Sequence, residues 1–216
     1  DELTDDQRYL LELIARNVDI LLRLVNQLLD FRKFENGKLQ LHCSNVDLRE
    51  CMMRWNDAFM LYVRGKYIKF SFCCDENADY RATVDVEKIE RAYYNIFSNA
   101  VKFTPPNGRI DVRLYAVERE DGRRLAIAIA NTGSYIPPEQ AARIFDRFYQ
   151  GVKTDTGYGI GLAITQAFIE MHGGTITVES DETTGTRFIV EIPVDACVAE
   201  EGDHFEPVSY THLRAH

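Results

Sequence analysis

The chain has 216 residues, of which 45% are hydrophobic and 27% are charged, and its formal net charge is −9. This composition is ordinary for a globular protein and excludes wholesale disorder. An acidic chain is poorly suited to binding nucleic acid through its phosphates, and no apolar run approaches the roughly 18 residues that cross a bilayer. We therefore expect neither a nucleic-acid partner nor direct membrane contact by this segment.

The first predicted element is one long helix. Thr4-Asp5-Asp6-Gln7 has the form of a capping box and marks its start. Apolar side chains then form two adjacent stripes, a width that suits a helix in a four-helix bundle. The stripes contain Leu10, Ile14, Asn17, Leu21, Leu24, Leu28 and Phe31, and Leu11, Val18, Leu22, Val25 and Leu29. We expect the partner helices to come from sequence outside this chain or from another copy, with docking on the chain's own globular domain as the alternative.

Shorter elements follow this helix. Gly37 is its predicted end, and Asp47 is the predicted N-cap of a second helix that runs to about Val63. Alternating side chains predict strands at 38–42, 67–72 and 81–84.

Asp85 is the predicted N-cap of a third helix, which carries polar side chains of possible function. Its core-facing stripe is Ile89, Tyr93, Ile96, Ala100 and Phe103. On a neighbouring stripe, Asn95, Asn99 and Lys102 project from one side of the helix. Two amide oxygens can hold a hydrated Mg2+, and an ammonium can hold a phosphate. A merely solvated helix face is the alternative interpretation.

The second half of the chain completes the predicted fold. Asp121-Gly122 joins two strands as a hairpin, and Pro138 suits the first turn of a short helix after a polar loop. The expected elements are strands 109–118 and 123–130, helical piece 141–148, mobile loop 150–158, helix 159–171 and strands 175–179 and 186–192. This order predicts an α+β fold, a two-layer α/β sandwich with a mixed sheet, preceded by the long helix.

Gly157-Tyr158-Gly159-Ile160-Gly161-Leu162 places glycines at alternate positions just before a predicted helix. Glycine allows close approach of the backbone to an anion, and free N–H groups at a helix start point toward it. We therefore expect a phosphate here, although the triplet is not the dinucleotide-binding fingerprint, which needs a tight strand-to-helix turn.

Together, five stretches resemble the N, G1, F, G2 and G3 boxes of sensor histidine kinases. These stretches are 95–105, 131–137, 144–148, 157–162 and 185–186. Residues 21–41 resemble the end of the second dimerisation helix of that family, especially in hybrid two-component sensors. The resemblance implies the Bergerat-type ATP-binding sandwich shared with gyrase, MutL and heat-shock chaperone ATPases. It divides the chain into a dimerisation helix at 1–36, an ATP-binding catalytic domain at 37–193 and a disordered tail at 194–216.

The resemblance also implies ATP and Mg2+ as cofactors. Asn95 and Asn99 would ligate Mg2+ with Lys102 near the phosphates, and these side chains would be the catalytic ones. Asn131 takes the place of the aspartate that binds adenine, and Gly133 permits the close turn beneath the base. The remaining implied ATP-binding residues are Ile136, Phe145, Phe148, Gly157, Tyr158, Gly159, Ile160, Gly161, Leu162 and Thr186.

Some of these residues have simpler interpretations. Phe145 and Phe148 would anchor the mobile lid, but core packing would also account for them. Thr186 would line the pocket near the adenine, with an ordinary hairpin threonine as the alternative.

Three positions depart from the family pattern. The amide of Asn131 can still accept a hydrogen bond from adenine, but a neutral acceptor gives roughly half the strength of a charged one, so we expect weak affinity. Tyr135 stands where a second glycine is usual, which predicts a different turn. Arg91 stands where many members of the wider superfamily carry a carboxylate that activates water, so we expect slow intrinsic ATP hydrolysis.

The histidines lack the context of the family's phosphoacceptor, which lies in an H box on the first dimerisation helix. These histidines are His42, His172, His204, His212 and His216. We expect His42, in a strand, and His172, at a helix end, to be structural. The chain should therefore be unable to autophosphorylate in the family's manner.

We interpret the chain as the catalytic part of a two-component sensor histidine kinase, transferring the ATP γ-phosphoryl to a histidine on a helix absent from this chain. Expected partners are that helix, a second copy in a homodimer, and a response regulator or receiver domain. The expected location is the cytoplasmic portion of a membrane-anchored bacterial sensor. The alternatives are a degenerate nucleotide-binding scaffold and an ATPase clamp of the gyrase or MutL kind.

Two further expectations concern the cysteines and the C-terminus. Cys43, Cys51, Cys73, Cys74 and Cys197 have no metal-site spacing and are expected to be reduced thiols in a cytosolic setting. Residues 207–216 resemble the in-frame translation of a transposase sequencing adapter, so we interpret them as an assembly artefact and do not offer their histidines as metal ligands.

Overall fold

The computed structural model describes residues 32–150 and 159–197 and the single positions 10, 11, 14, 18, 25 and 29, without the side chains at 61 and 62. Residues 32–35 and the six single positions are helical, so the predicted long helix is supported only in part, and its capping box lies outside the described residues. Within the described part of the chain, no helix is long and apolar enough to cross a membrane.

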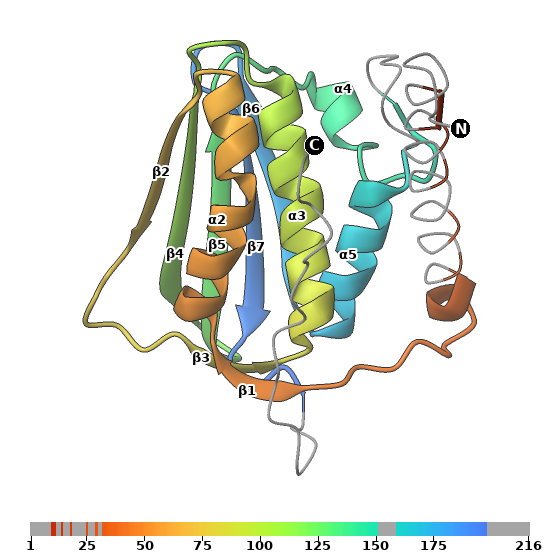
Figure 1. Ribbon diagram of the computed structural model, residues 1–216. Coiled ribbons are helices and arrows are strands. Elements are labelled where there is room, and N and C mark those ends of the chain that lie inside the picture. Colours follow the sequence, from red (N-terminus) through yellow and green to blue (C-terminus); the bar gives the residue numbers. More distant parts are fainter. Residues whose placement is uncertain are drawn as a thin grey trace, which may run out of the picture.

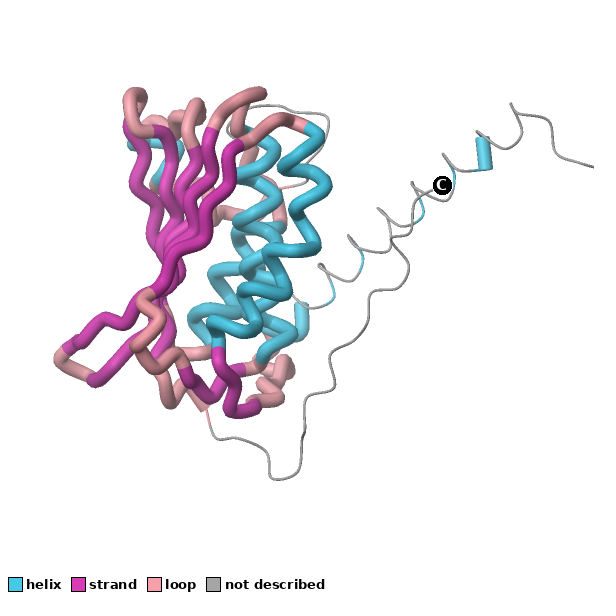
Figure 2. Tube along the Cα trace, turned by 60° about the vertical axis from the view of Figure 1, so that its left-hand side comes forward, coloured by secondary structure: helices cyan, strands magenta, loops and turns pink. Residues whose placement is uncertain are grey.

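A five-stranded sheet and a layer of helices form the body of the molecule (Figures 1 and 2). In order across the sheet, the strands are β2 (Lys69–Cys74), β4 (Arg109–Arg119), β5 (Gly122–Asn131), β7 (Gly185–Pro193) and β6 (Thr175–Asp181). β2 runs parallel to β4 and the other neighbours are antiparallel, so the sheet is mixed. The prediction of a two-layer α+β sandwich with a mixed sheet is confirmed.

The helices all cover one face of the sheet, and the other face is open (Figure 2). They are α2 (Leu48–Gly65), α3 (Val86–Phe103) and α5 (Gly161–Met171), with the short α4 (Pro138–Ala141) beside them. A separate pair of strands, β1 (Ser44–Asp47) and β3 (Arg81–Val84), closes one end. The core therefore lies between the sheet and α2, α3 and α5.

Helix α3 begins where the sequence predicts. The Asp85 carboxylate accepts from the backbone N–H of Lys88 at 3.1 Å and so caps the helix. The predicted stripe is buried except for Phe103, which is 41% exposed and corrects the prediction. At the C-terminal end of α3 the buried residue is instead Thr104, whose hydroxyl donates to the carbonyl of Ala100 at 2.6 Å.

The hairpin of β4 and β5 positions the end of the central strand. Gly122 begins β5 with a positive φ, as the Asp121-Gly122 signal predicts. β5 is flanked by β4 and β7, and in its pairing with β7, Asn131 lies opposite Thr186. Two residues predicted to bind adenine thus meet across neighbouring strands at one edge of the sandwich.

Two predicted elements are wrong. Residues 38–42 form no strand, because Gly37 ends the helix in a Schellman arrangement and the next strand is β1. His42 is therefore in a loop, where its backbone N–H donates to Asp85 at 2.9 Å. The helical piece at 141–148 is also absent: α4 covers only Pro138–Ala141, and turns follow until Phe148, whose φ of 59° is incompatible with a helix.

A disulfide between Cys43 and Cys197 corrects the expectation of reduced thiols at these two positions. The chain segments before β1 and after β7 both lie beside β3, since the N–H of Thr83 donates to the carbonyl of Val194 at 2.7 Å. This brings the two cysteine Cα atoms within 6.2 Å, across 154 residues of sequence. Cys51, Cys73 and Cys74 are free thiols, as expected.

Candidate functional site

Asn95 projects from α3 toward the start of α5. Its Nδ2 donates to the backbone carbonyl of Gly161 and to the Thr165 hydroxyl, each at 3.2 Å. The Thr165 hydroxyl in turn donates to the Gly161 carbonyl at 2.8 Å. Because the donor side of the amide is engaged in this way, Oδ1 of Asn95 remains as an acceptor, which is the atom that Mg2+ prefers in an amide.

Asn99 and Lys102 continue the same side of α3. Both side chains are half-buried. Desolvation lowers the pKa of the Lys102 ammonium, which lies 5.1 Å from the centre of the Phe103 ring. The predicted arrangement of two amides and one ammonium along one stripe is therefore present.

The start of α5 faces Asn95 of α3. Among the described residues, no side chain caps the helix, and Ile160 occupies the N-cap position. The first backbone N–H groups of α5 are consequently suited to an anion. Leu162 faces inward and packs on the core. Gly157 and Tyr158 lie outside the described residues.

Phe148 and Gly159 join the two ends of the segment 149–158. The N–H of Phe148 donates to the carbonyl of Gly159 at 2.8 Å, and a Cβ on Gly159 would lie 2.6 Å from the Phe148 carbonyl carbon. Phe148 is 66% exposed as a residue, so core packing does not account for it. Phe145, by contrast, packs against the core, where its ring and that of Phe188 form a T-shaped, edge-to-face pair.

Asn131 lies at the centre of a second polar cluster. Its Nδ2 donates to the Ser134 hydroxyl at 2.8 Å, and Ser134 donates to Thr186 at 2.9 Å. Thr186 also contacts the Ser180 hydroxyl at 2.8 Å, which accepts from the N–H of Ile136 at 2.9 Å. Sequence reasoning missed Ser134 and Ser180, although Ser134 lies only three residues after Asn131 in the same motif.

Two glycines make this cluster possible. Gly133 has a φ of 78°, and a Cβ there would lie 2.5 Å from the Pro105 ring. Gly185 has a φ of 94°, and a Cβ there would lie 2.1 Å from the carbonyl oxygen of Asn131. Tyr135, at the position of a usual glycine, is not among the residues with positive φ, so it causes no strain of this kind.

His172 is buried and has both ring nitrogens engaged. Nδ1 lies 2.7 Å from the carbonyl of Phe168, and Nε2 accepts from the N–H of Asp85 at 3.0 Å. Burial lowers the pKa of this imidazole. Its ligand atoms lie within 4.8 Å of the sulfurs of Cys43 and Cys197, but the disulfide and the two ring contacts leave no atom of this cluster for a metal.

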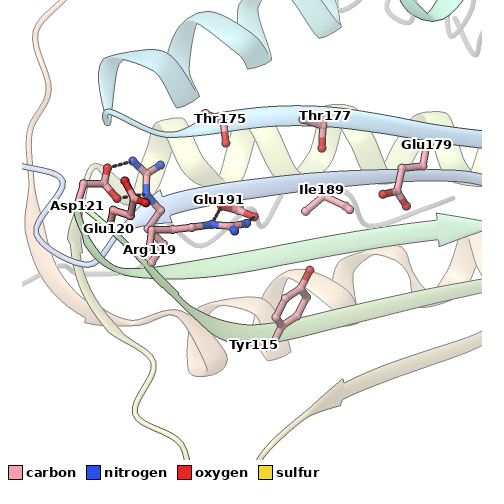
Figure 3. Close-up of a pocket in the computed structure, with 10 residues that line it drawn as sticks. Tyr115, Arg119, Glu120, Asp121, Thr175, Thr177, Glu179, Ile189 and Glu191 are labelled. Carbon is pink, nitrogen blue, oxygen red and sulfur yellow. Dashed lines mark hydrogen bonds and ion pairs between the residues drawn. The ribbon is translucent and has the colours of Figure 1, made fainter. Parts of the chain in front are cut away.

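A hollow on the open face of the sheet is a separate feature (Figure 3). It is bounded by Tyr115, Ile189 and residues of β6, on the side away from the helices. Arg119 is paired with Glu191, and Arg124 is paired with Asp121. Because the charges of these arginines are already paired, the hollow is a weaker candidate for an anion site than the uncapped start of α5.

Comparison with known proteins agrees with this geometry. Residues 84–196 match the family described as "Histidine kinase-, DNA gyrase B-, and HSP90-like ATPase". The "Hybrid signal transduction histidine kinase D" of Dictyostelium discoideum is 34% identical over 189 residues, which are 85% of this chain and 12% of that protein.

Solved structures of histidine kinases are also similar to this chain. The chain is 28% identical to full-length ShkA, crystallised with AMPPNP, with a TM-score of 0.77 over 92% of this chain and 41% of that one. It is 26% identical to histidine kinase ThkA in complex with the response regulator TrrA, with a TM-score of 0.69 over 91% of this chain and 53% of that one. The chain thus spans about an eighth of the Dictyostelium kinase and under half of ShkA.

Proposed function

Since this chain belongs to the histidine kinase-, DNA gyrase B- and HSP90-like ATPase family, as an ATP-binding catalytic domain of the histidine kinase type, we propose that it phosphorylates a histidine. In the whole protein, the γ-phosphoryl group of Mg-ATP would pass to a histidine on a helix outside this chain. The observation that carries the proposal is the orientation of Asn95, whose donor atoms are held by α5 and whose carbonyl oxygen is left for a metal.

The residues present fit Mg2+ and ATP. Mg2+ takes oxygen ligands, and we assign the amide oxygens of Asn95 and Asn99 to it. When bound, the ion would neutralise charge on the phosphates. Lys102 and the uncapped N–H groups at the start of α5 would hold phosphate oxygens, and Asn131 would accept from the adenine amino group.

The chain's own residues would contribute positioning and charge rather than a nucleophile. The contact of Asn95 with Gly161 keeps the metal ligand and the phosphate-binding start of α5 at a fixed separation. Gly159 and Gly161 would let the backbone approach the phosphates, and Gly157 and Tyr158 are assigned to the same segment. Such positioning is the main source of catalysis in phosphoryl transfer.

We further propose that residues 1–36 belong to a dimerisation helix and 37–193 to the catalytic domain. The end of the helix touches the catalytic part: Glu35 pairs with Arg147 at 2.6 Å, and Phe34 and Leu39 pack against α5. Movement of the helix would thereby reach α5 and the turn that precedes Phe148. A second copy and a response regulator or receiver domain are the proposed partners, and the complex of ThkA with TrrA supports the response regulator.

The rival functions lack a supporting observation of this kind. An ATPase clamp would need a group to activate water near Asn95, but position 91 is an arginine whose guanidinium stacks 5.3 Å from the ring of Phe168. A scaffold without nucleotide would still need the contact of Asn95 with Gly161 for stability, but it would not need the Asn99 amide and the Lys102 ammonium on the same side of α3.

Labelled ATP distinguishes these functions in the full-length protein. A kinase gives acid-labile, alkali-stable phosphohistidine that disappears in Asn99→Ala, with little free phosphate. Steady release of phosphate without phosphohistidine would indicate the clamp, and neither product would indicate the scaffold.

A further inference from the structure

The Asn131 amide has a fixed orientation. This side chain is 5% exposed, and its Nδ2 donates to the Ser134 hydroxyl at 2.8 Å and contacts the carbonyl of Thr132 at 3.4 Å. Because a backbone carbonyl can only accept, the group that faces Thr132 has to be the NH2. Within the described residues, Oδ1 accepts no hydrogen bond, so the carbonyl side is left for a ligand.

Ser134 can accept this bond because its own hydrogen is used elsewhere. The Ser134 hydroxyl donates to Thr186 at 2.9 Å, and Thr186 is 3% exposed and touches the Ser180 hydroxyl at 2.8 Å. Ser180 in turn accepts from the backbone N–H of Ile136 at 2.9 Å. The direction of the bonds is therefore set by two backbone carbonyls. The carbonyl of Thr132 faces Nδ2 of Asn131, and the carbonyl of Ser134 accepts from the Thr186 hydroxyl at 3.3 Å, which leaves Thr186 to accept from the Ser134 hydroxyl.

Orientation matters for an amide in a way that it does not for a carboxylate. Both oxygens of an aspartate accept, so either rotamer can bind the 6-amino group of adenine. An asparagine offers an acceptor on one side and a donor on the other, and the donor would suit the 6-oxo group of guanine or hypoxanthine. A site that uses asparagine must fix the amide in order to discriminate between these purines.

We propose that Ser134 determines purine specificity by holding the Asn131 amide with Oδ1 toward the base, so that the site selects 6-amino over 6-oxo purines. This inference rests on the proposed function, in which Asn131 meets the base. Ser134 is a positioning residue, because it acts through Asn131 and the hydroxyls of Thr186 and Ser180.

The test is a double-mutant cycle on the whole chain with two probes, AMPPNP and GMPPNP, in the presence of Mg2+. Calorimetry gives the ratio of the two dissociation constants for the parent, Ser134→Ala, Asn131→Asp and the double variant. Ser134→Thr is the matched control, because it keeps the hydroxyl. Thermal unfolding of each variant checks that the fold is retained.

We expect Ser134→Ala to reduce the preference for AMPPNP by about tenfold, the equivalent of one lost hydrogen bond. Ser134→Thr should preserve the preference, and Ser134→Ala should leave it unchanged within about twofold when Asn131 is already aspartate, because that side chain needs no orientation.

The other outcomes overturn the inference in distinguishable ways. An unchanged preference in Ser134→Ala, or an equal loss for both nucleotides in both backgrounds, would leave the proposed function standing and make Ser134 merely structural. If only the Asn131→Asp variants bind nucleotide, Asn131 does not read the base and the inference is wrong. If no variant binds either probe, the proposed function and the inference are both wrong.

Discussion

The side-chain Nδ2 of Asn95 lies 3.2 Å from the backbone carbonyl oxygen of Gly161 and donates a hydrogen bond to it. This bond connects the middle of α3 with the first residue of α5, two elements that are far apart in the sequence. The proposed metal ligand and the proposed phosphate-binding backbone are therefore directly joined, and this contact can be tested separately from nucleotide binding.

Asn95→Asp should destabilise the fold more than Asn99→Asp. The new carboxylate cannot donate to the Gly161 carbonyl and would place negative charge against that oxygen, at a cost of about 1–3 kcal/mol. No hydrogen bond from the Asn99 side chain connects it to another described element, which makes it the matched control. Urea unfolding without nucleotide measures both variants, and equal stabilities would show that the contact with α5 contributes nothing.

Gly185→Ala should be among the most damaging single-methyl changes in the chain. The added Cβ would lie 2.1 Å from the carbonyl oxygen of Asn131, a backbone atom that cannot move away without opening the strand pair. We expect a loss above roughly 3 kcal/mol, or no soluble protein. Gly37→Ala is the control, because Gly37 has a similar left-handed φ of 61° but nothing within 4 Å of its Cβ.

For Gly37→Ala the backbone conformation alone should cost roughly 1–2 kcal/mol. Guanidinium unfolding compares the two variants. A loss at Gly185 no larger than at Gly37 would mean that the approach of these two strand ends is looser than described.

Reduction should lower the stability of the protein through the bond between Cys43 and Cys197. The disulfide closes a loop of 154 residues, and in the chain-entropy model such a constraint contributes about 2–5 kcal/mol. Unfolding with and without dithiothreitol measures the difference. Cys43→Ser should abolish the effect of the reductant, whereas Cys73→Ser, at an exposed free thiol, should retain it. A parent protein indifferent to dithiothreitol would contradict the cross-link.

Stability should decline as the pH falls below about 6.5, the ordinary pKa of histidine. Burial lowers the pKa of His172 in the folded state, and its Nε2 must be unprotonated to accept from the N–H of Asp85. The unfolded state therefore binds more protons in this window, and the stabilisation that is fully present above pH 6.5 is lost toward the folded pKa.

His172→Gln should flatten the pH dependence between pH 7.5 and 5.5, whatever its effect on stability at pH 7.5. His42→Gln is the control, because the described contact of His42 with Asp85 uses its backbone N–H and survives the substitution. Urea midpoints across this range provide the measurement, and parallel curves for the parent and His172→Gln would contradict the assignment.

The parts of the fold that depend on local sequence were predictable. Asp85 and Asp47 both cap helices, and the Asp121-Gly122 hairpin forms, because capping and turn chemistry act over a few residues. The absence of a helix over 142–148 was not predictable from periodicity, since Phe148 takes a left-handed φ of 59° where its N–H donates to the carbonyl of Gly159.

The candidate site also had one part that the sequence could predict and one part that it could not. Asn95 and Asn131 belong to recognisable motifs, so their positions could be predicted from the sequence. The orientation of each amide could not, because it depends on partners brought together by folding: Gly161 and Thr165 for Asn95, and Ser134 with its hydroxyl network for Asn131. The disulfide was missed for the same reason, since its cysteines become neighbours only when the chain closes around β3.

The most direct test of the central claim is a calorimetric titration of the chain with AMPPNP, with and without Mg2+, beside Asn99→Ala. We expect binding that requires Mg2+ and is lost in Asn99→Ala, while the thermal unfolding of that variant without nucleotide stays close to that of the parent. Binding that is indifferent to Mg2+ and to Asn99→Ala, or no binding by the parent chain, would contradict the site proposed for this domain.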